Sequence, residues 1–266
     1  MPQAKPWDRQ DLLLAFSLYT ELTFGQLYQR NKKIIQYALW MGRTPSSLAM
    51  KLVNIASLDP VIIASGRKGL SAASKADRAM WQEMQENRLL FSTALQDAVA
   101  TIGIPIVAEI SETSAKGFDV QEPSQTSYLG ETREATVQVR IGQAYFRAAV
   151  LSAYNNRCCI SGLAVPQLLV ASHIVPWRQD INQRLNPQNG LALSSLHDKA
   201  FDLGFLTIDE DYRVVVSEKV GATNDEFFVS ALRSFHGKPM QLPMKYGLQA
   251  EFLAMHREQI FEKFGP

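Results

Sequence analysis

The chain has 266 residues, of which 46% are hydrophobic and 20% are charged, as in a folded globular protein with enough material for two domains. Its net charge of +1 excludes strong overall basicity, so a nucleic-acid-binding surface has to come from local clusters of Lys and Arg. The first residues, MPQAKPWDRQD, are polar and charged, and no apolar run is long enough to span a bilayer. We therefore expect a cytoplasmic protein without a membrane segment.

Residues 7 to about 58 have the apolar spacing of helices. Asp8 is expected to cap the first helix. A later helical stretch divides at Gly42, because glycine suits the left-handed position after a helix, and the next helix begins at Thr44 with Pro45 in its first turn. Two short helices joined by a tight turn predict a helix-turn-helix-like element.

The second helix of this element has a polar and basic N-terminal half, the part of a recognition helix that enters the major groove. We predict that it contacts double-stranded DNA through Arg43, Ser46, Ser47 and Lys51. Helical hairpins also occur in cores that never touch DNA, so a purely structural role stays open. In the basic loop that follows, Arg67 and Lys68 are expected either to contact phosphates or to lie in a solvated turn.

The middle of the chain predicts a domain boundary. A helix is expected from Ser74 to about Val99, and residues 111 to about 135 are polar, rich in Ser, Thr and Glu, and without periodicity. We interpret the sequence as a helical DNA-recognition domain over 1–110, a linker over 111–135 and a second domain over 136–266. The second domain is expected to begin with the last residues of a strand, followed by a helix.

The most informative stretch runs from Arg157 to Asp202. LLVASHIV is apolar and β-branched and predicts a buried strand that presents His173 at its end. A polar loop with the turn pairs NP and NG follows, then a brief second strand, LAL, and a short helix, LHDKAFDLG, ended by Gly204. A strand, loop, strand and helix in this order can point His173 and His197 at one place.

Imidazole chemistry suggests what such a unit can do. Because the unperturbed pKa of histidine is near neutrality, one imidazole can accept a proton from water while another binds a divalent metal. Hydrolysis of a phosphodiester needs an activated water and a cation near the developing negative charge. Each histidine taken alone is explained at least as well as a hydrogen-bonded structural residue.

SHIVPW, NPQNGLALS and LHDKAFD together resemble the HNH endonuclease family, whose ββα-metal site has His, Asn and His in this order and at about this spacing. The flanking GQAYFRAAVLSAYNNRCCISGL, FLTIDEDYRVVVS and MKYGLQAEFLAMHREQIF are similar to a bacterial restriction-type branch of that family. The resemblance covers roughly residues 138–264. The predicted fold class is α+β, with a helical N-terminal domain and a C-terminal ββα-metal nuclease domain.

The resemblance implies a role for each motif residue. His173 would be the general base, Asn189 would hold the loop and the base by side-chain hydrogen bonds, and His197 would bind the metal. Ser172 stands where many members carry Asp or His as another metal ligand, and a serine hydroxyl is a weak ligand. The nearest carboxylates that could substitute are Asp198 and Asp202, for which ordinary helix-surface hydrogen bonding is the alternative.

The implied cofactor is a divalent metal, Mg²⁺ or Mn²⁺, with Co²⁺ or Ni²⁺ also compatible. A structural zinc is not expected, because some relatives build it from two CxxC pairs and this chain has only the adjacent Cys158 and Cys159. Adjacent cysteines also argue against a disulfide and fit a reducing cytoplasm. His236 and His256 lack the strand-and-loop setting and are expected to be structural.

The sequence therefore predicts a metal-dependent DNA endonuclease, and in particular a restriction enzyme. A homodimer is expected, because one ββα-metal site cuts one strand of double-stranded DNA. A mobile-element nuclease is the alternative within the enzyme class. The alternative outside it is a DNA-binding or regulatory protein whose nuclease domain has lost activity because Ser172 replaces a ligand.

Overall fold

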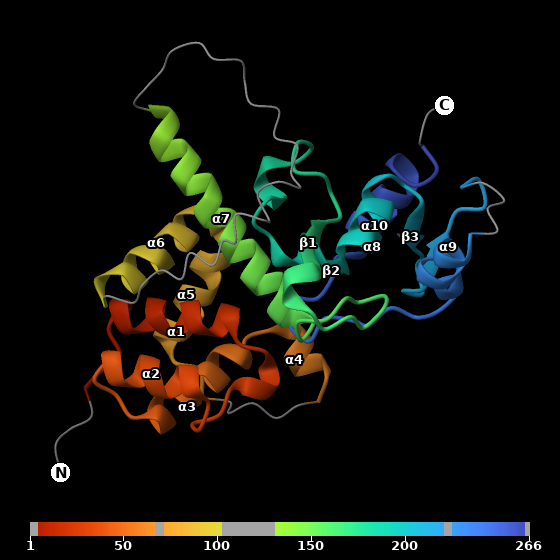
Figure 1. Ribbon diagram of the computed structural model, residues 1–266. Coiled ribbons are helices and arrows are strands. Elements are labelled where there is room, and N and C mark those ends of the chain that lie inside the picture. Colours follow the sequence, from red (N-terminus) through yellow and green to blue (C-terminus); the bar gives the residue numbers. More distant parts are fainter. Residues whose placement is uncertain (1–4, 67–71, 103–130, 221–224, 264–266) are drawn as a thin grey trace.

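The computed structural model describes residues 5–66, 72–102, 131–220 and 225–263 (Figure 1). Arg67, Lys68 and residues 111–130 of the predicted linker lie outside these ranges. No helix within the described ranges is long and apolar enough to cross a membrane.

The N-terminal part consists of helices α1 (Arg9–Glu21), α2 (Lys32–Trp40), α3 (Pro45–Ala56), α4 (Pro60–Ala64), α5 (Lys75–Glu86) and α6 (Arg88–Thr101), with a short 3-10 turn, η1 (Phe24–Gln26), after α1. The expected caps are present. The Asp8 side chain accepts a hydrogen bond from the Asp11 amide, and the Thr44 side chain accepts one from Ser47. Gly42 has a φ of 62°, in the left-handed region.

The helix predicted from Ser74 to Val99 is interrupted at Asn87. This residue has a φ of −143°, and its side chain accepts a hydrogen bond from the Leu90 amide at the start of α6. An asparagine that caps the next helix offers its backbone an alternative to the helical ladder. The single predicted helix is therefore two, α5 and α6.

The central element is the helix α7 (Glu131–Ala153), which follows the undescribed segment. It includes residues 131–135, which the sequence assigned to the linker, and the residues expected to form a strand end. Figure 1 shows α7 running from the upper left of the molecule to its centre, with the N-terminal helices on one side and the small sheet on the other. It packs against α1 and α6 as well as against the sheet.

The C-terminal part has a mixed architecture of small sheets and helices, as predicted. Strands β1 (Leu169–His173) and β2 (Gly190–Ser194) pair antiparallel, with His173 opposite Gly190. The remaining elements are α8 (Ser195–Asp202), the β3 (Leu206–Ile208) and β4 (Val214–Val216) hairpin, α9 (Glu226–Ala231), α10 (Ala250–Gln259) and the 3-10 turns η2 (Pro166–Leu168), η3 (Ile181–Gln183), η4 (Pro187–Asn189) and η5 (Arg233–Phe235). The strand, loop, strand and helix expected around His173 are all present.

One buried cluster of apolar side chains runs through both predicted domains. Buried hydrogen bonds also join them. The Ser152 hydroxyl of α7 donates to the Thr20 carbonyl at 2.6 Å, and the Lys245 ammonium donates to the Tyr19 and Leu22 carbonyls at 2.8 and 2.9 Å. Since lysine is rarely buried without partners, these contacts fix the C-terminal segment against the end of α1.

The sheet lies directly against α7 at Gly190. A Cβ atom at this position would lie 2.3 Å from Val150 Cγ2 and 3.0 Å from Phe146 Cζ. We expect Gly190→Ala to lower the free energy of unfolding by about 1–3 kcal/mol, because overpacking forces neighbouring side chains to move. Urea denaturation measures the effect, and Gly25→Ala is the control, since nothing lies within 4 Å of its Cβ position. Equal midpoints for the two variants would contradict this packing.

His256 of α10 is buried, as a structural histidine should be. Its Nδ1 accepts a hydrogen bond from the Thr207 hydroxyl at 2.9 Å, and its Nε2 donates to the Phe201 carbonyl at 3.1 Å. The ring stacks on Phe201 with centroids 3.6 Å apart. These contacts suit a neutral imidazole, and burial lowers the pKa of His256 to about 4.

The lowered pKa of His256 predicts a loss of stability in acid. An unfolded histidine has a pKa of about 6.5, so protonation between about pH 6.5 and 4 favours the unfolded chain and removes about 3 kcal/mol of stability. Above about pH 6.5, His256 is neutral in both the folded and the unfolded chain, and this stability is fully present. Urea unfolding at pH 7.5 and 4.5 should show a smaller pH dependence for His256→Gln than for the wild type. The same pH dependence in both proteins would contradict the buried neutral state.

Candidate functional site

The candidate site is formed by the β1–β2 hairpin, the loop between its strands and helix α8. The hairpin lies between α7 and α8 (Figure 1). Successive side chains of a strand point to opposite faces, so His173 packs towards α7 and Ser172 towards α8. The amide of Ile174 donates to the Asn189 carbonyl at 2.9 Å, which brings both ends of the loop together beside His173.

His173 is held by stacking and by one hydrogen bond. Its ring lies parallel to Phe146, with centroids 4.0 Å apart, and meets Trp177 edge-on at 5.4 Å. Its Nε2 donates to the Arg184 carbonyl at 2.9 Å. Burial lowers the pKa of His173. The imidazole is therefore neutral at pH 7, and its acceptor Nδ1 has no hydrogen-bond partner among the described residues, which is the state that a general base needs.

Asn189 holds the loop that supports His173. The side chain is buried, its Oδ1 accepts from the Val175 amide at 2.7 Å, and its Nδ2 donates to the Val175 and Gln183 carbonyls at 3.2 Å each. These bonds connect the two ends of the loop. The Arg184 guanidinium closes it further by donating to the Trp177 carbonyl at 2.7 Å. The Arg184 carbonyl that orients His173 thus belongs to a fixed segment.

His197 lies in a different environment from the one expected of a metal ligand. Its ring is buried and meets Phe235 edge-on at 5.3 Å. Nδ1 lies 2.9 Å from Ser194 Oγ and 3.4 Å from Cys158 Sγ, and Nε2 donates to the Ala231 carbonyl at 2.9 Å. Both ring nitrogens are engaged, so this geometry does not support the predicted metal-binding role. The imidazole instead connects α8 to α9 and to the loop before β1.

Two carboxylates of α8 lie where the sequence placed its substitutes for the missing ligand. Asp198 and Asp202 are four residues apart and share one face of the helix. Burial raises the pKa of Asp198, and the Ser172 hydroxyl beside it partly offsets that effect. Burial and then repulsion from Asp198 raise the pKa of Asp202 to about 7, although the Asp202 side chain keeps contact with solvent. The two carboxylates therefore repel each other, and Asp198 is the one that lies beside Ser172 of β1.

This cluster fits a small, hard cation. Ser172 Oγ is buried and forms no hydrogen bond of good geometry with any described residue. The two carboxylates and the Ser172 hydroxyl are oxygen donors of the kind that Mg²⁺ prefers, and Mg²⁺ commonly uses one or two carboxylates with water and phosphate. In the part of the chain that the structure describes, no group of three or more His, Cys, Asp or Glu side chains is placed to hold a metal. Water and a phosphate would therefore complete the coordination.

Cys158 is a neighbour that the sequence did not connect to the site. Burial raises the pKa of its thiol, but hydrogen bonds with His197, Ser161 and Ile160 outweigh burial and bring the pKa to about 6. Cys158 and Cys159 are both buried free thiols. The contact with His197 joins positions 39 residues apart, a separation that no local pattern could reveal.

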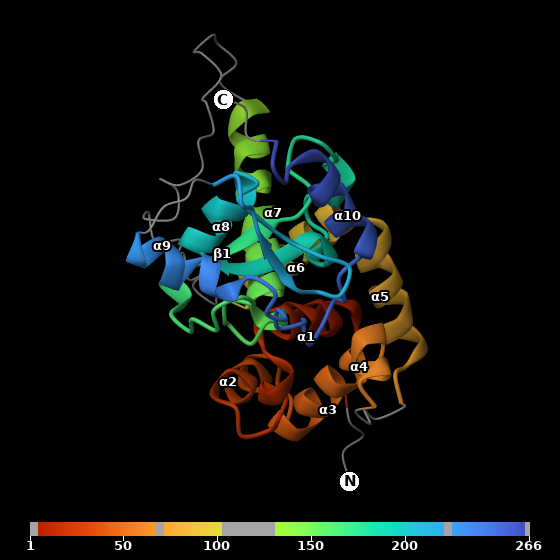
Figure 2. The same ribbon diagram turned by 90° about the vertical axis from the view of Figure 1, so that its right-hand side faces the viewer.

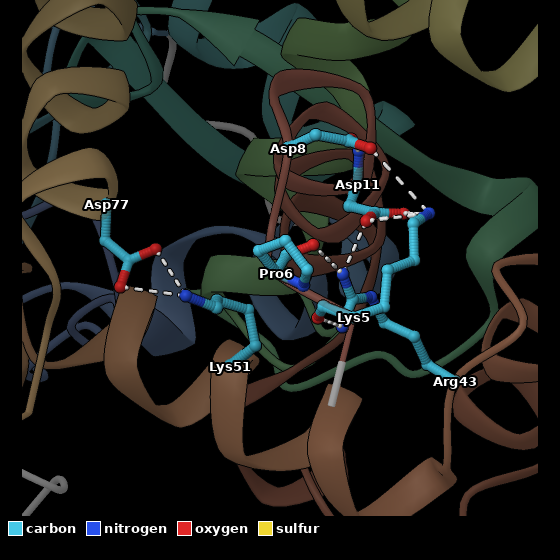
Figure 3. Close-up of polar contacts among 7 residues, drawn as sticks. All are labelled: Lys5, Pro6, Asp8, Asp11, Arg43, Lys51 and Asp77. Atoms are coloured by element: carbon cyan, nitrogen blue, oxygen red, sulfur yellow. Dashed lines mark hydrogen bonds and ion pairs between the residues drawn. The ribbon is translucent and has the colours of Figure 1, made fainter. Parts of the chain in front are cut away.

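Two residues predicted to contact DNA are internal ion-pair partners instead (Figure 3). The Arg43 side chain, only 5% exposed, pairs with Asp11, donates to the Lys5 and Pro6 carbonyls and lies over the Trp7 ring. Lys51 is buried against Asp77, at 2.8 and 3.1 Å from its two oxygens. The prediction is thus corrected for Arg43 and Lys51, whose charges are neutralised inside the helical part. Ser46 is exposed and Ser47 half-buried at the start of α3.

The Lys51–Asp77 pair makes a stability prediction. Lys51→Ala leaves a buried carboxylate without its cation, and we expect the free energy of unfolding to fall by about 3–5 kcal/mol. Lys219→Ala is the control, since its ion pair with Glu262 is exposed and such pairs contribute about 0–1 kcal/mol. Thermal and urea unfolding measure both. A loss below about 1 kcal/mol for Lys51→Ala would be incompatible with a structural ion pair.

Residues 158–209 match the family model of the HNH endonucleases. The match runs from Cys158 through β1, β2 and α8 to the end of β3, and so includes His173, Asn189 and His197. The chain therefore contains an HNH domain, which suggests nuclease activity. The match covers well under half of the chain, and the N-terminal helices lie outside it. A search of the curated proteins finds no match to this chain.

Proposed function

We propose that this protein is a metal-dependent endonuclease that hydrolyses phosphodiester bonds of double-stranded DNA, with His173 as the general base. One observation carries the proposal. Within an HNH domain, a neutral imidazole is fixed by the Arg184 carbonyl at Nε2, and no described residue forms a hydrogen bond with its Nδ1. On the neighbouring strand position, Ser172 lies beside Asp198 of α8.

His173 takes a proton from the attacking water at Nδ1. The Arg184 carbonyl accepts the Nε2 hydrogen throughout and stabilises the positive charge that the ring then acquires. Phe146 and Trp177 fix the orientation of the ring from two sides. Asn189 acts through the loop, because its three hydrogen bonds hold the segment that carries the Arg184 carbonyl.

Asp198 and Asp202 are the residues proposed to hold the metal, with the Ser172 hydroxyl beside them. A divalent cation, when bound, supplies positive charge to the scissile phosphate and to the leaving oxygen. Because this donor set contains oxygens and no free imidazole, Mg²⁺ or Mn²⁺ is favoured over Co²⁺ or Ni²⁺. In this proposal His197 positions α8.

We further propose a restriction role in the cytoplasm, on the similarity of the flanking segments to the restriction-type branch. Two copies of the chain would be needed to cut both strands. The second candidate is a DNA-binding protein without catalysis, and Ser172 in place of an acidic ligand is the observation that favours it.

Cleavage of a mixed panel of unmodified and cytosine-modified plasmid and phage DNAs tests the proposal. We expect cutting with Mg²⁺ or Mn²⁺ and none with EDTA, and discrete fragments if the enzyme selects a sequence. Retained DNA binding with no cutting of any substrate would favour the non-catalytic candidate.

A further inference from the structure

An open cleft of about 620 Å³ separates the N-terminal helices from the segment that leads into β1. One wall comes from the end of α1, from η1 and from the start of α2. The other wall includes Asn156 and Pro166, which belong to the C-terminal part. The cleft thus lies at the junction of the HNH domain with the helices that precede it.

The walls of this cleft carry an excess of positive charge. Arg30, Lys32 and Lys33 line it together with a single carboxylate, Glu21. Lys33 pairs with Glu21 at 2.7 Å. Arg30 and Lys32 are exposed, and neither has an ion-pair partner within the described parts of the chain. This contrasts with Arg43, just before α3, and Lys51 of α3, whose charges are neutralised by Asp11 and Asp77.

The uncharged lining also suits a polyanion. The Tyr28 side chain is 53% exposed in the cleft, and its hydroxyl can donate a hydrogen bond. Asn156 offers an amide donor on the opposite wall. Phosphate oxygens of nucleic acids are contacted mainly by Arg and Lys, with Tyr and Asn side chains as additional donors. The residue types in the cleft are therefore those of a phosphate-backbone contact.

The cleft is within reach of a duplex bound at His173. Pro166 and His173 are seven residues apart in the chain, so they are separated by at most about 25 Å. At about 3.4 Å per base pair, this distance corresponds to about seven base-pair steps. A duplex that extends by this length from the scissile phosphate is long enough to reach the wall of the cleft that contains Pro166, and Arg30 and Lys32 also line this cleft.

We propose that Arg30, Lys32 and Tyr28 form a second contact for the phosphate backbone of the DNA that His173 cuts. The inference rests on the proposed nuclease function for the identity of the polyanion. It moves the DNA contact of the N-terminal part from α3, where the sequence placed it, to the start of α2. Because backbone contacts carry no base readout, this cleft positions the duplex and does not select its sequence.

The test measures DNA binding in a His173→Ala background, so that cleavage does not interfere. Arg30→Gln with Lys32→Gln removes two charges from the cleft. Arg78→Gln with Lys263→Gln removes two exposed charges elsewhere, and Figure 2 shows α5, which carries Arg78, on the opposite side of the N-terminal helices from α2. For a duplex of about 30 base pairs, the cleft variant should raise Kd about tenfold at low salt and reduce the slope of log K against log salt by about 2.

The outcomes separate this inference from the proposed function. If the cleft variant and the control variant have equal affinities and salt slopes, the cleft is not a DNA contact, even if the wild type cuts DNA. A His173→Ala protein that binds no DNA would overturn the inference as well. If DNA binding depends on Arg30 and Lys32 but the wild type cuts no DNA, the cleft is a DNA contact and only the proposed nuclease function is contradicted. Unchanged unfolding midpoints show that the variants are folded.

Discussion

His173→Ala is expected to lower the rate of DNA cleavage by about 10²–10⁴-fold, the usual contribution of a general base. The physical reason is the loss of a neutral acceptor that the Arg184 carbonyl holds in a fixed orientation at the end of β1. Phe146 and Trp177 pack against the ring but offer no replacement acceptor at that position. DNA binding should stay within about threefold of the wild type, since the imidazole is uncharged at pH 7.

Single-turnover cleavage under saturating enzyme measures this effect without contributions from product release. His236→Ala is the matched control, because His236 is exposed and its Nδ1 accepts only the Val216 amide at 3.1 Å. We expect the His236 variant to cut at the rate of the wild type. A loss of less than about tenfold in the His173 variant would show that another group removes the proton.

Asp198→Asn is expected to reduce cleavage by at least about 100-fold and to weaken Mn²⁺ binding, since the amide removes the charge that attracts the cation. His197→Ala should act differently. The alanine leaves the Ala231 carbonyl without its hydrogen-bond donor and opens a space beside Phe235. An unsatisfied buried carbonyl alone costs about 1–3 kcal/mol of stability. Mn²⁺ affinity should persist in the folded fraction of that variant.

Titration calorimetry with Mn²⁺, together with thermal unfolding, separates the two roles. We expect Asp198→Asn to unfold near the wild-type temperature with weaker Mn²⁺ binding, and His197→Ala to unfold at a lower temperature with Mn²⁺ binding retained. The reverse pattern would show that the imidazole leaves Ser194 and Ala231 to bind the metal, as the family resemblance implied. Asp211→Asn, at an exposed position of the β3–β4 turn outside the cluster, is the control for a general loss of negative charge.

Local sequence patterns predicted the elements of the site well. Gly204 shows why, since it has a φ of 72°, in the left-handed region that glycine adopts most readily after a helix. Asp8 and Thr44 cap their helices through bonds to residues three positions ahead. Such signals involve neighbouring residues and do not depend on the rest of the fold.

The predicted roles that differ from the structure belong to residues whose interaction partners lie far away in the sequence. Arg43 and Lys51 have the composition of a DNA-binding surface, but Asp11 and Asp77 lie 32 and 26 residues away and neutralise them. His197 has the position of a metal ligand in the motif, but Ala231 and Cys158 engage its nitrogens. Adjacent residues of a helix point in different directions, so His197 of α8 contacts α9 through the Ala231 carbonyl and Asp198 lies beside Ser172 of β1.

Chemical rescue of a His173→Gly variant tests directly whether His173 removes the proton from the attacking water. The glycine leaves a ring-shaped space between Phe146 and Trp177 that free imidazole can enter. If His173 has this role, His173→Gly cleaves DNA slowly in a single turnover without imidazole and faster as the imidazole concentration rises, while the rate of Asp198→Asn does not change with imidazole. Cleavage by His173→Gly at the wild-type rate in the absence of imidazole would contradict this role.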